Sequence, residues 1–223
     1  MSLADLTPFW LTLRLAGLVT AILMLVATPL AWWLAHSRSR LRPLVEAVTA
    51  LPLVLPPTVL GFYLLVALNP STPLGGLWMA ATGTSLTFSF AGLVVASLIY
   101  SLPFAVQPLQ AAFAEVGRKP IEAAASCGAS PLDAFLSVGI PLARRGYLAA
   151  AVLSFAHTLG EFGVVLMVGG NIPGQTKTIA IAIYERVEVL DYPAAHGMSA
   201  LLVALSFVAL YLLFRTNRRE ARG

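Results

Sequence analysis

Long apolar segments constrain this chain more than any other feature of its sequence. A helix needs about 20 mainly apolar residues to cross a bilayer. Five segments reach that length, namely Phe9–Ala35, Val45–Leu68, Leu86–Phe113, Tyr147–Gly170 and His196–Phe214. Charged residues make up only 11% of the chain, whereas a soluble domain carries about 25%. The sequence therefore predicts an all-α integral membrane protein, one domain over residues 1–223, with about five transmembrane helices.

The number of spans depends on one further patch. Thr178–Tyr184 is apolar but too short to cross a membrane, so we expect an external surface helix or a re-entrant helix. Full insertion of this patch would raise the number of spans to six. The first apolar segment exceeds the roughly 7–15 residues of a signal-peptide core and has no basic residues before it. We therefore expect it to be a permanent span.

Basic residues orient the predicted spans. Most of the 14 Lys and Arg residues follow the first span, separate the third from the fourth, or follow the fifth. These residues are Arg38, Arg40, Arg42, Arg118, Lys119, Arg144, Arg145, Arg215, Arg218, Arg219 and Arg222. Because basic loops stay on the cytosolic side, the N-terminus is predicted outside and the C-terminus in the cytosol.

The longest polar interruption, residues 118–146, has the local signals of two short helices. Pro120 suits a first helical turn, and Glu122 lies near the positive end of the helix dipole. Gly128 can adopt the left-handed conformation that ends a helix. These signals predict a first short helix that ends at Gly128.

A second short helix is predicted directly afterwards. Ser130 is a good N-cap, Pro131 suits the first helical position and Asp133 the third. We expect Gly139 and Pro141 to end this helix. Such complete capping indicates a cytosolic docking hairpin rather than an ordinary solvated loop, which stays as the alternative.

Prolines interrupt the second and third spans. Pro52, Pro56 and Pro57 lie within six residues of the second span, and Pro103 and Pro108 lie in the third. Each proline removes a backbone donor and bends a helix, although isolated prolines also occur for packing alone. Broken helices beside a cavity are typical of a translocation path. The candidate path residues are Pro56, Pro57, Thr58, Gly160, Glu161 and Asn171.

Two ionisable residues in the fourth span are four positions apart. On a continuous helix, His157 and Glu161 would share one face. We expect a hydrogen-bonded structural pair, with Glu161 opposed to Arg14, although Arg14 can also snorkel outward and the pair can also relay protons. A metal site is disfavoured because His36 and His196 lie near opposite membrane faces.

No catalytic motif is present in the sequence. Residues 169–176, GGNIPGQT, match part of a phosphate-binding loop, but Gln175 stands where that loop needs lysine. The single cysteine, Cys127, excludes an intramolecular disulfide. We therefore expect a non-enzymatic chain without a metal or cofactor.

The spacing of the polar hairpin matches a known motif. Glu122, Ala123 and Ala124 are followed by three residues and Gly128, and nine more residues lead to VGIP at 138–141. This pattern resembles the EAA loop of permease subunits of bacterial ABC importers, with Val138 and Ile140 as mild departures. In that family the loop forms coupling helices that enter a cleft on a separate ATPase subunit. The resemblance implies coupling roles for Glu122, Ala123, Ala124, Gly128, Ser130, Pro131, Asp133, Val138, Ile140 and Pro141.

Two further segments narrow the resemblance. Leu51–Leu65 and Leu159–Glu185 are similar to segments of molybdate permeases, and sulfate and thiosulfate permeases share related GEFG and Asn-Ile sequences. The resemblance implies a homodimeric permease in the bacterial inner membrane. Its implied partners are two ABC ATPase subunits that hold ATP-Mg, and an external oxyanion-binding protein; nucleic acid is not expected.

Other functions stay open at this point. A sulfate or tungstate permease would have the same architecture. An ion-coupled secondary carrier would use His157 and Glu161 for proton transfer. A non-transporting assembly scaffold would need neither.

Overall fold

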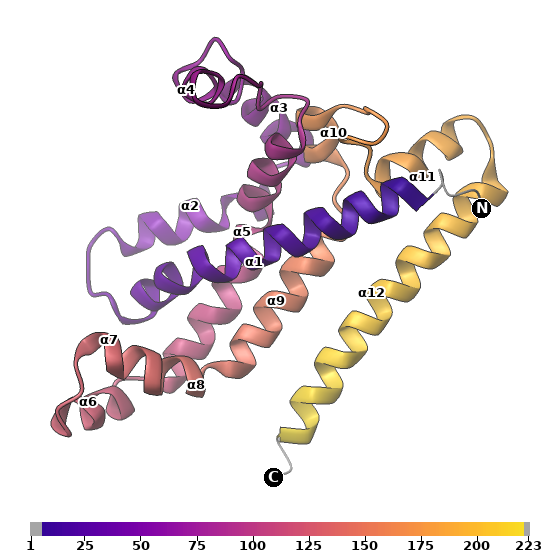
Figure 1. Ribbon diagram of the computed structural model, residues 1–223. Coiled ribbons are helices and arrows are strands. Elements are labelled where there is room, and N and C mark those ends of the chain that lie inside the picture. Colours follow the sequence, from indigo (N-terminus) through magenta and orange to yellow (C-terminus); the bar gives the residue numbers. More distant parts are fainter. Residues whose placement is uncertain (1–5, 221–223) are drawn as a thin grey trace.

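Helices form the whole architecture of residues 6–220, the part of the chain that the computed structural model describes (Figure 1). No strand occurs within that range, so the predicted all-α fold is confirmed. In chain order the elements are α1 (Thr7–His36), α2 (Arg42–Val54), α3 (Pro57–Ala67), α4 (Pro73–Thr82), α5 (Phe90–Val116), α6 (Lys119–Ser126), α7 (Pro131–Ala134), the π-helical turn η2 (Phe135–Gly139), α8 (Ile140–Leu142), α9 (Arg144–Leu159), α10 (Gly163–Gly169), α11 (Ile179–Glu188) and α12 (Tyr192–Glu220).

The centre of the bundle is formed by α1, α5 and α9, which pack against one another along much of their lengths. Leu15, Val19, Leu23, Ala27 and Ala31 recur every four residues on α1 and are buried. Small residues in this stripe let neighbouring backbones approach closely, which matters because lipid gives apolar helices little hydrophobic reason to associate. The stripe therefore fixes α1 as a central helix.

Three helices of the described range are long and apolar enough to cross a membrane: α1, α5 and the 192–211 part of α12. Two bent helix pairs, one of 113° and one of 70°, raise that number to as many as five. About five spans were expected, and the upper count is five. Its 70° pair, however, joins Pro131–Leu142 to Arg144–Leu159 and so differs from the predicted fourth span, Tyr147–Gly170. The basic residue Arg222 of the orientation argument lies outside the described residues.

Adjacent prolines break the second span as predicted. Its two halves, α2 and α3, meet at 113°. Leu55 and Pro56, which each precede a proline, have extended backbone with ψ of 136° and 135°. This is the conformation that a following proline ring favours. The other prolines behave differently, because α5 continues as one helix through Pro103 and Pro108.

The predicted third span begins later than expected. Leu86 was its predicted start, but α5 begins at Phe90, where Ser89 Oγ accepts a hydrogen bond from Gly92 N at 3.1 Å. An N-cap of this kind satisfies a free donor of the first turn, so it determines where the helix starts. The preceding helix, α4, has no counterpart among the predicted elements; Thr72 caps its start.

The fourth predicted span, Tyr147–Gly170, is two helices rather than one. The first, α9, ends at Leu159, and α10 begins at Gly163. Glu161 lies in the connection, where its carboxylate accepts a hydrogen bond from Val164 N at 2.7 Å. His157 and Glu161 therefore do not share a helix, and their predicted common helical face is wrong.

The apolar patch after the fourth span forms the short helix α11. Thr178 caps it, and Thr12 Oγ1 on α1 accepts a hydrogen bond from Ile179 N at 2.8 Å. Figure 1 shows α11 and the hairpin of α6, α7 and α8 at opposite ends of α1. The helix of ten residues is too short to span, as expected.

The last helix, α12, diverges from the bundle (Figure 1). Only 6% of the apolar stretch in its 192–211 part is buried, and the helices that it contacts include α11 and α9. Val203, Phe207 and Tyr211 are exposed on it. An apolar helix with so little burial needs lipid or another protein around it.

Candidate functional site: a capped hairpin and a pair of broken helices

The polar segment 118–146 folds as the predicted helix–glycine–helix hairpin. Gly128 has φ of +92°, in the left-handed region that favours glycine. Its N–H donates to Ala125 O at 2.9 Å and the next N–H donates to Ala124 O at 3.1 Å, so the last carbonyls of α6 are satisfied. The predicted glycine end of the first helix is confirmed.

The second helix of the hairpin begins as predicted but ends differently. Ser130 Oγ accepts a hydrogen bond from Asp133 N at 3.2 Å, which confirms the N-cap. The helix does not stop at Gly139 and Pro141. Instead it passes through the π-turn η2 and continues to Leu142. The wider turn shifts the hydrogen-bond register and leaves Pro141 in a first-turn position, where its missing N–H costs little.

The outer surface of the hairpin combines polar and apolar side chains. Leu132, Leu136 and Leu142 are exposed to between 51% and 66%. Exposed leucines on this hairpin indicate a surface that another protein or the membrane covers. The sequence argument missed them because it followed the glycine and capping positions; the spacing of four between Leu132 and Leu136 was the available signal. Among the predicted coupling residues, those exposed are Glu122, Ala123, Gly128, Ser130, Pro131, Asp133 and Pro141, whereas Ala124, Val138 and Ile140 are half-buried.

The two broken spans meet at a second location. Both α3 and α10 begin there, and they pack side by side. A Cβ added to Gly163 would lie 2.7 Å from Pro57 Cβ, and one added to Gly61 would lie 2.8 Å from Met167 Cβ. Only glycine permits these approaches, so Gly61 and Gly163 join the site although the sequence argument did not select them.

The candidate path residues separate into two groups. Gly160 and Glu161 occupy the break before α10, whose start contacts Pro57 at the start of α3. Pro56 and Thr58 flank that proline and are exposed. Asn171 is elsewhere, because it follows the far end of α10.

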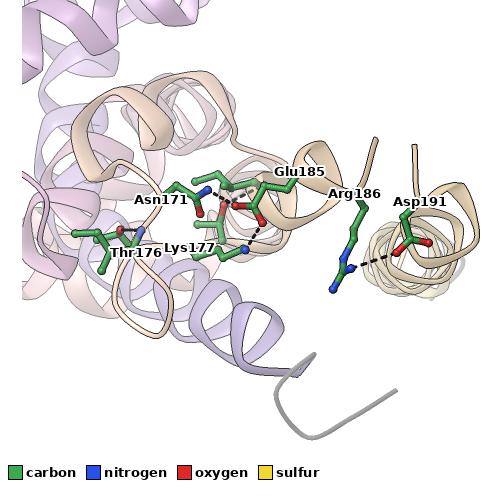
Figure 2. Close-up of polar contacts among 9 residues, drawn as sticks. Asn171, Thr176, Lys177, Glu185, Arg186 and Asp191 are labelled. Atoms are coloured by element: carbon green, nitrogen blue, oxygen red, sulfur yellow. Dashed lines mark hydrogen bonds and ion pairs between the residues drawn. The ribbon is translucent and has the colours of Figure 1, made fainter. Parts of the chain in front are cut away.

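Asn171 belongs to a polar cluster that joins the loop before α11 to Glu185 on α11, shown in Figure 2. Its side-chain amide and the Lys177 ammonium group both donate to the carboxylate of Glu185. Lys177 lowers the pKa of Glu185 below its ordinary value, and Asn171 adds to this effect. Arg186 pairs with Asp191 at 3.2 Å. Lys177 and Arg186, the two basic residues between the fourth and fifth predicted spans, are therefore both in ion pairs.

The ionisable residues of the spans have different partners from those predicted. His157 Nδ1 lies 3.0 Å from Ser101 Oγ, and its ring stacks on Phe104 with centroids 3.9 Å apart. The Arg14 guanidinium lies over the Phe90 ring, 4.8 Å from its centroid, so Arg14 does not oppose Glu161. No group of three or more His, Cys, Asp and Glu side chains suited to a metal occurs between residues 6 and 220.

Two grooves adjoin the loop that carries Gly174. One, of about 440 Å³, is lined by Trp10, Arg14, Phe90 and Gln175 among others. The other, of about 310 Å³, is lined by residues that include Lys177, Glu185 and Arg186. The end of the molecule opposite the hairpin is thus hollowed and carries paired charges.

Comparisons with known proteins agree with this arrangement. Residues 27–220 match the family described as binding-protein-dependent transport system inner membrane component. The molybdenum transport system permease protein ModB of Azotobacter vinelandii is 54% identical over 217 residues, which cover 97% of this chain and 96% of that protein. The sulfate transport system permease protein CysT of Escherichia coli (strain K12) is 34% identical over 193 residues, covering 86% and 68%.

Solved structures share the fold. The inward-facing MetNI methionine ABC transporter has a chain that matches with a TM-score of 0.75 at 19% identity, covering 98% of this chain and 99% of that one. A bacterial alginate ABC transporter, in complex with an alginate pentasaccharide-bound periplasmic protein, matches with a TM-score of 0.77 at 17% identity, covering 98% and 80%. From the match over residues 27–220 and the near full-length similarity to permeases, the chain belongs to the binding-protein-dependent transport system inner membrane component family.

Proposed function

We propose that this chain is the permease subunit of an ATP-driven importer for molybdate or a similar oxyanion. The observation that carries this proposal is the 54% identity to a molybdenum permease over 97% of the chain. Sulfate permeases are also related, at 34% identity, so sulfate is the secondary cargo candidate. The chain itself forms the path and the coupling element, and the ATPase is a separate subunit.

The segment 118–146 is the coupling loop in this proposal. Its outward face, with exposed Glu122, Leu132 and Leu136, enters a cleft on an ABC ATPase subunit that holds ATP-Mg. When two ATPase subunits close on ATP, they draw two such hairpins together and turn the path outward; hydrolysis resets it. The caps at Gly128 and Ser130 support a rigid hairpin. A rigid hairpin passes movement of the ATPase on to the membrane helices, whereas a flexible loop would absorb that movement.

The path runs between two copies of this chain in the bacterial inner membrane, beside the breaks at Pro56–Thr58 and Gly160–Glu161. A dianion pays a large desolvation cost in a bilayer, so a transient water-filled path is required. Interrupted helices expose backbone groups to such a path. The little-buried apolar surface of α12 supports assembly with a second copy and lipid.

The orientation that we propose places the N-terminus and α11 outside, and the hairpin and C-terminus in the cytosol. The opposite positions of α11 and the hairpin along α1 support this orientation (Figure 1). An external oxyanion-binding protein then delivers cargo to the end that carries α11.

Uptake into vesicles tests this proposal directly. Two copies of the chain, the ATPase and the binding protein are reconstituted, and labelled molybdate uptake is measured with molybdate, tungstate and sulfate as competitors. We expect uptake that requires ATP and that unlabelled molybdate blocks better than sulfate does. Stronger competition by sulfate would reassign the cargo, and uptake without ATP that collapses with the proton gradient would favour a secondary carrier.

A further inference from the structure

The buried side of the hairpin meets a single tryptophan ring of α1. The centroid of the Trp32 ring lies 4.9 Å from that of Phe135 in η2, at an interplanar angle of 67°. It lies 5.1 Å from the ring centroid of Phe113 on α5, at 89°. Phe113 in turn contacts Tyr147 on α9, with centroids 6.0 Å apart. Edge-to-face pairs of this kind add to stability beyond the area that they bury. One aromatic cluster thus joins the hairpin to all three central helices.

The π-turn of the hairpin is shaped around this ring. A Cβ added to Gly139 would lie 3.0 Å from Trp32 Cζ3 and 3.3 Å from Cη2, so the glycine backbone itself packs on the indole. The same added Cβ would lie 3.6 Å from Phe135 Cδ2, which places both residues on the ring side of the turn. Gly139 is buried, and a side chain here would require the Trp32 ring to shift.

A hydrogen bond attaches the base of the hairpin to the same turn of α1. The Arg118 guanidinium donates to His36 O at 2.9 Å. The His36 ring lies against Trp32 with centroids 4.0 Å apart at an interplanar angle of 36°, and its Nδ1 lies 3.0 Å from Trp32 O. The hairpin therefore contacts the end of α1 both before α6 and within η2.

We propose that Trp32 is the positioning residue through which movement of the hairpin reaches the membrane helices. Close-packed interiors transmit displacement because they have little free volume. The hairpin is exposed on its outer face at Leu132 and Leu136 and held on its inner face by Trp32, so a force on the outer face acts on α1 and α5 through this ring. This inference rests on the proposed ATP-driven import.

The test is the number of molybdate ions moved per ATP hydrolysed in the reconstituted complex. Trp32→Ala should lower this ratio about fivefold, within the range that substitutions in a coupling network produce. ATP hydrolysis should fall much less than transport. Trp32→Phe retains an aromatic ring and should restore at least half of the ratio. The matched control is Trp33→Ala, because Trp33 is the next residue, is 37% exposed and should leave the ratio unchanged.

A second variant covers the case in which Trp32→Ala does not assemble. Phe135→Ala removes the ring contact from the hairpin side, and the same drop in ratio is expected. One outcome would overturn the inference: an unchanged ratio in an assembled Trp32→Ala or Phe135→Ala complex, whether transport and hydrolysis both stay at the wild-type level or both fall in parallel. Failure of the wild-type complex to import molybdate on ATP would instead overturn the proposed function.

Discussion

Single residues set the shape of the hairpin and of the loop before α11. Gly128 and Gly174 have φ of +92° and +75°, and a Cβ added at either would meet no atom within 4 Å. Replacing either glycine by another residue therefore strains the backbone but causes no steric clash. This makes them a matched pair at opposite ends of the molecule.

Replacing Gly128 tests the coupling role of the hairpin. A left-handed conformation costs an L residue about 1–2 kcal/mol, and more for a β-branched one. Gly128→Val should therefore weaken ATPase binding about tenfold while membrane insertion is retained, as measured by titration of the ATPase onto the solubilised permease. Gly174→Val imposes comparable strain away from the hairpin and should leave that affinity unchanged. Equal losses in both variants would contradict a specific coupling role.

The Glu185 cluster predicts a dependence on pH. Because Lys177 and Asn171 lower the pKa of Glu185 in the folded chain, their stabilisation is fully present above the pKa of the unfolded chain. It is lost as pH falls through the lower pKa of the folded state. Hydrogen exchange of residues 171–178 should therefore accelerate, relative to the rest of the chain, as acidity rises below about pH 4.

The variant Glu185→Gln gives the control for this pH effect. It replaces the carboxylate by an amide of similar size. Exchange in residues 171–178 should therefore be faster at neutral pH, and its rate relative to the rest of the chain should no longer change with acid. The loss of stability should stay below about 1 kcal/mol, because the pair is partly exposed. An unaltered pH profile in the variant would assign the effect to another group.

At the scale of elements, the break between α9 and α10 decides the role of Glu161. The carboxylate accepts the Val164 N–H at 2.7 Å, which is the role of a helix cap. A proton carrier would need the acidic proton of this residue, whereas a cap needs only an oxygen acceptor.

Two substitutions of Glu161 separate these roles. Glu161→Gln keeps an oxygen acceptor, and ATP-driven uptake should stay within about twofold of wild type. Glu161→Ala removes the acceptor and should cost about 1 kcal/mol of stability, measured as a lower melting temperature of the solubilised protein. Loss of uptake in Glu161→Gln with unchanged melting would support proton transfer instead.

The α2–α3 bend and the π-turn η2 differ in whether nearby or distant residues explain them. The bend between α2 and α3 follows from Pro56 and Pro57 alone, because a proline restricts the residue before it. The continuation of the hairpin helix through η2, which ends at Gly139, into α8, which contains Pro141, does not follow from local rules. There Gly139 packs on the ring of Trp32, which lies more than one hundred positions earlier in the chain, and no local pattern encodes that contact.

At the scale of the whole molecule, the proposed orientation can be tested with the natural cysteine. Cys127, the single cysteine of the sequence, is exposed at the end of α6. A membrane-impermeant maleimide should label it in inverted membrane vesicles and not in intact spheroplasts. The measurement is the mass shift of the purified chain.

Addition of the ATPase provides a second readout in the same experiment. Bound ATPase should slow the labelling of Cys127, because the residue adjoins Gly128 in the hairpin. Cys127→Ala should show no labelling in either preparation. Labelling from the outside would invert the orientation and would remove the hairpin from the ATPase.

Spans, orientation signals and hairpin caps could all be inferred from residues close together in the sequence. Apolar length, proline and N-cap serine act over one or two helical turns, so the fold class, the start of α7 and the role of Gly128 follow from them. The predicted partners of His157, Glu161 and Arg14 were wrong. The actual partners depend on where α9 ends and on which helix passes beside it, and local sequence does not show either. Only the packed bundle brings Trp32 against Gly139 and Pro57 against Gly163. Such contacts join residues about one hundred positions apart, and close packing rather than local preference selects them.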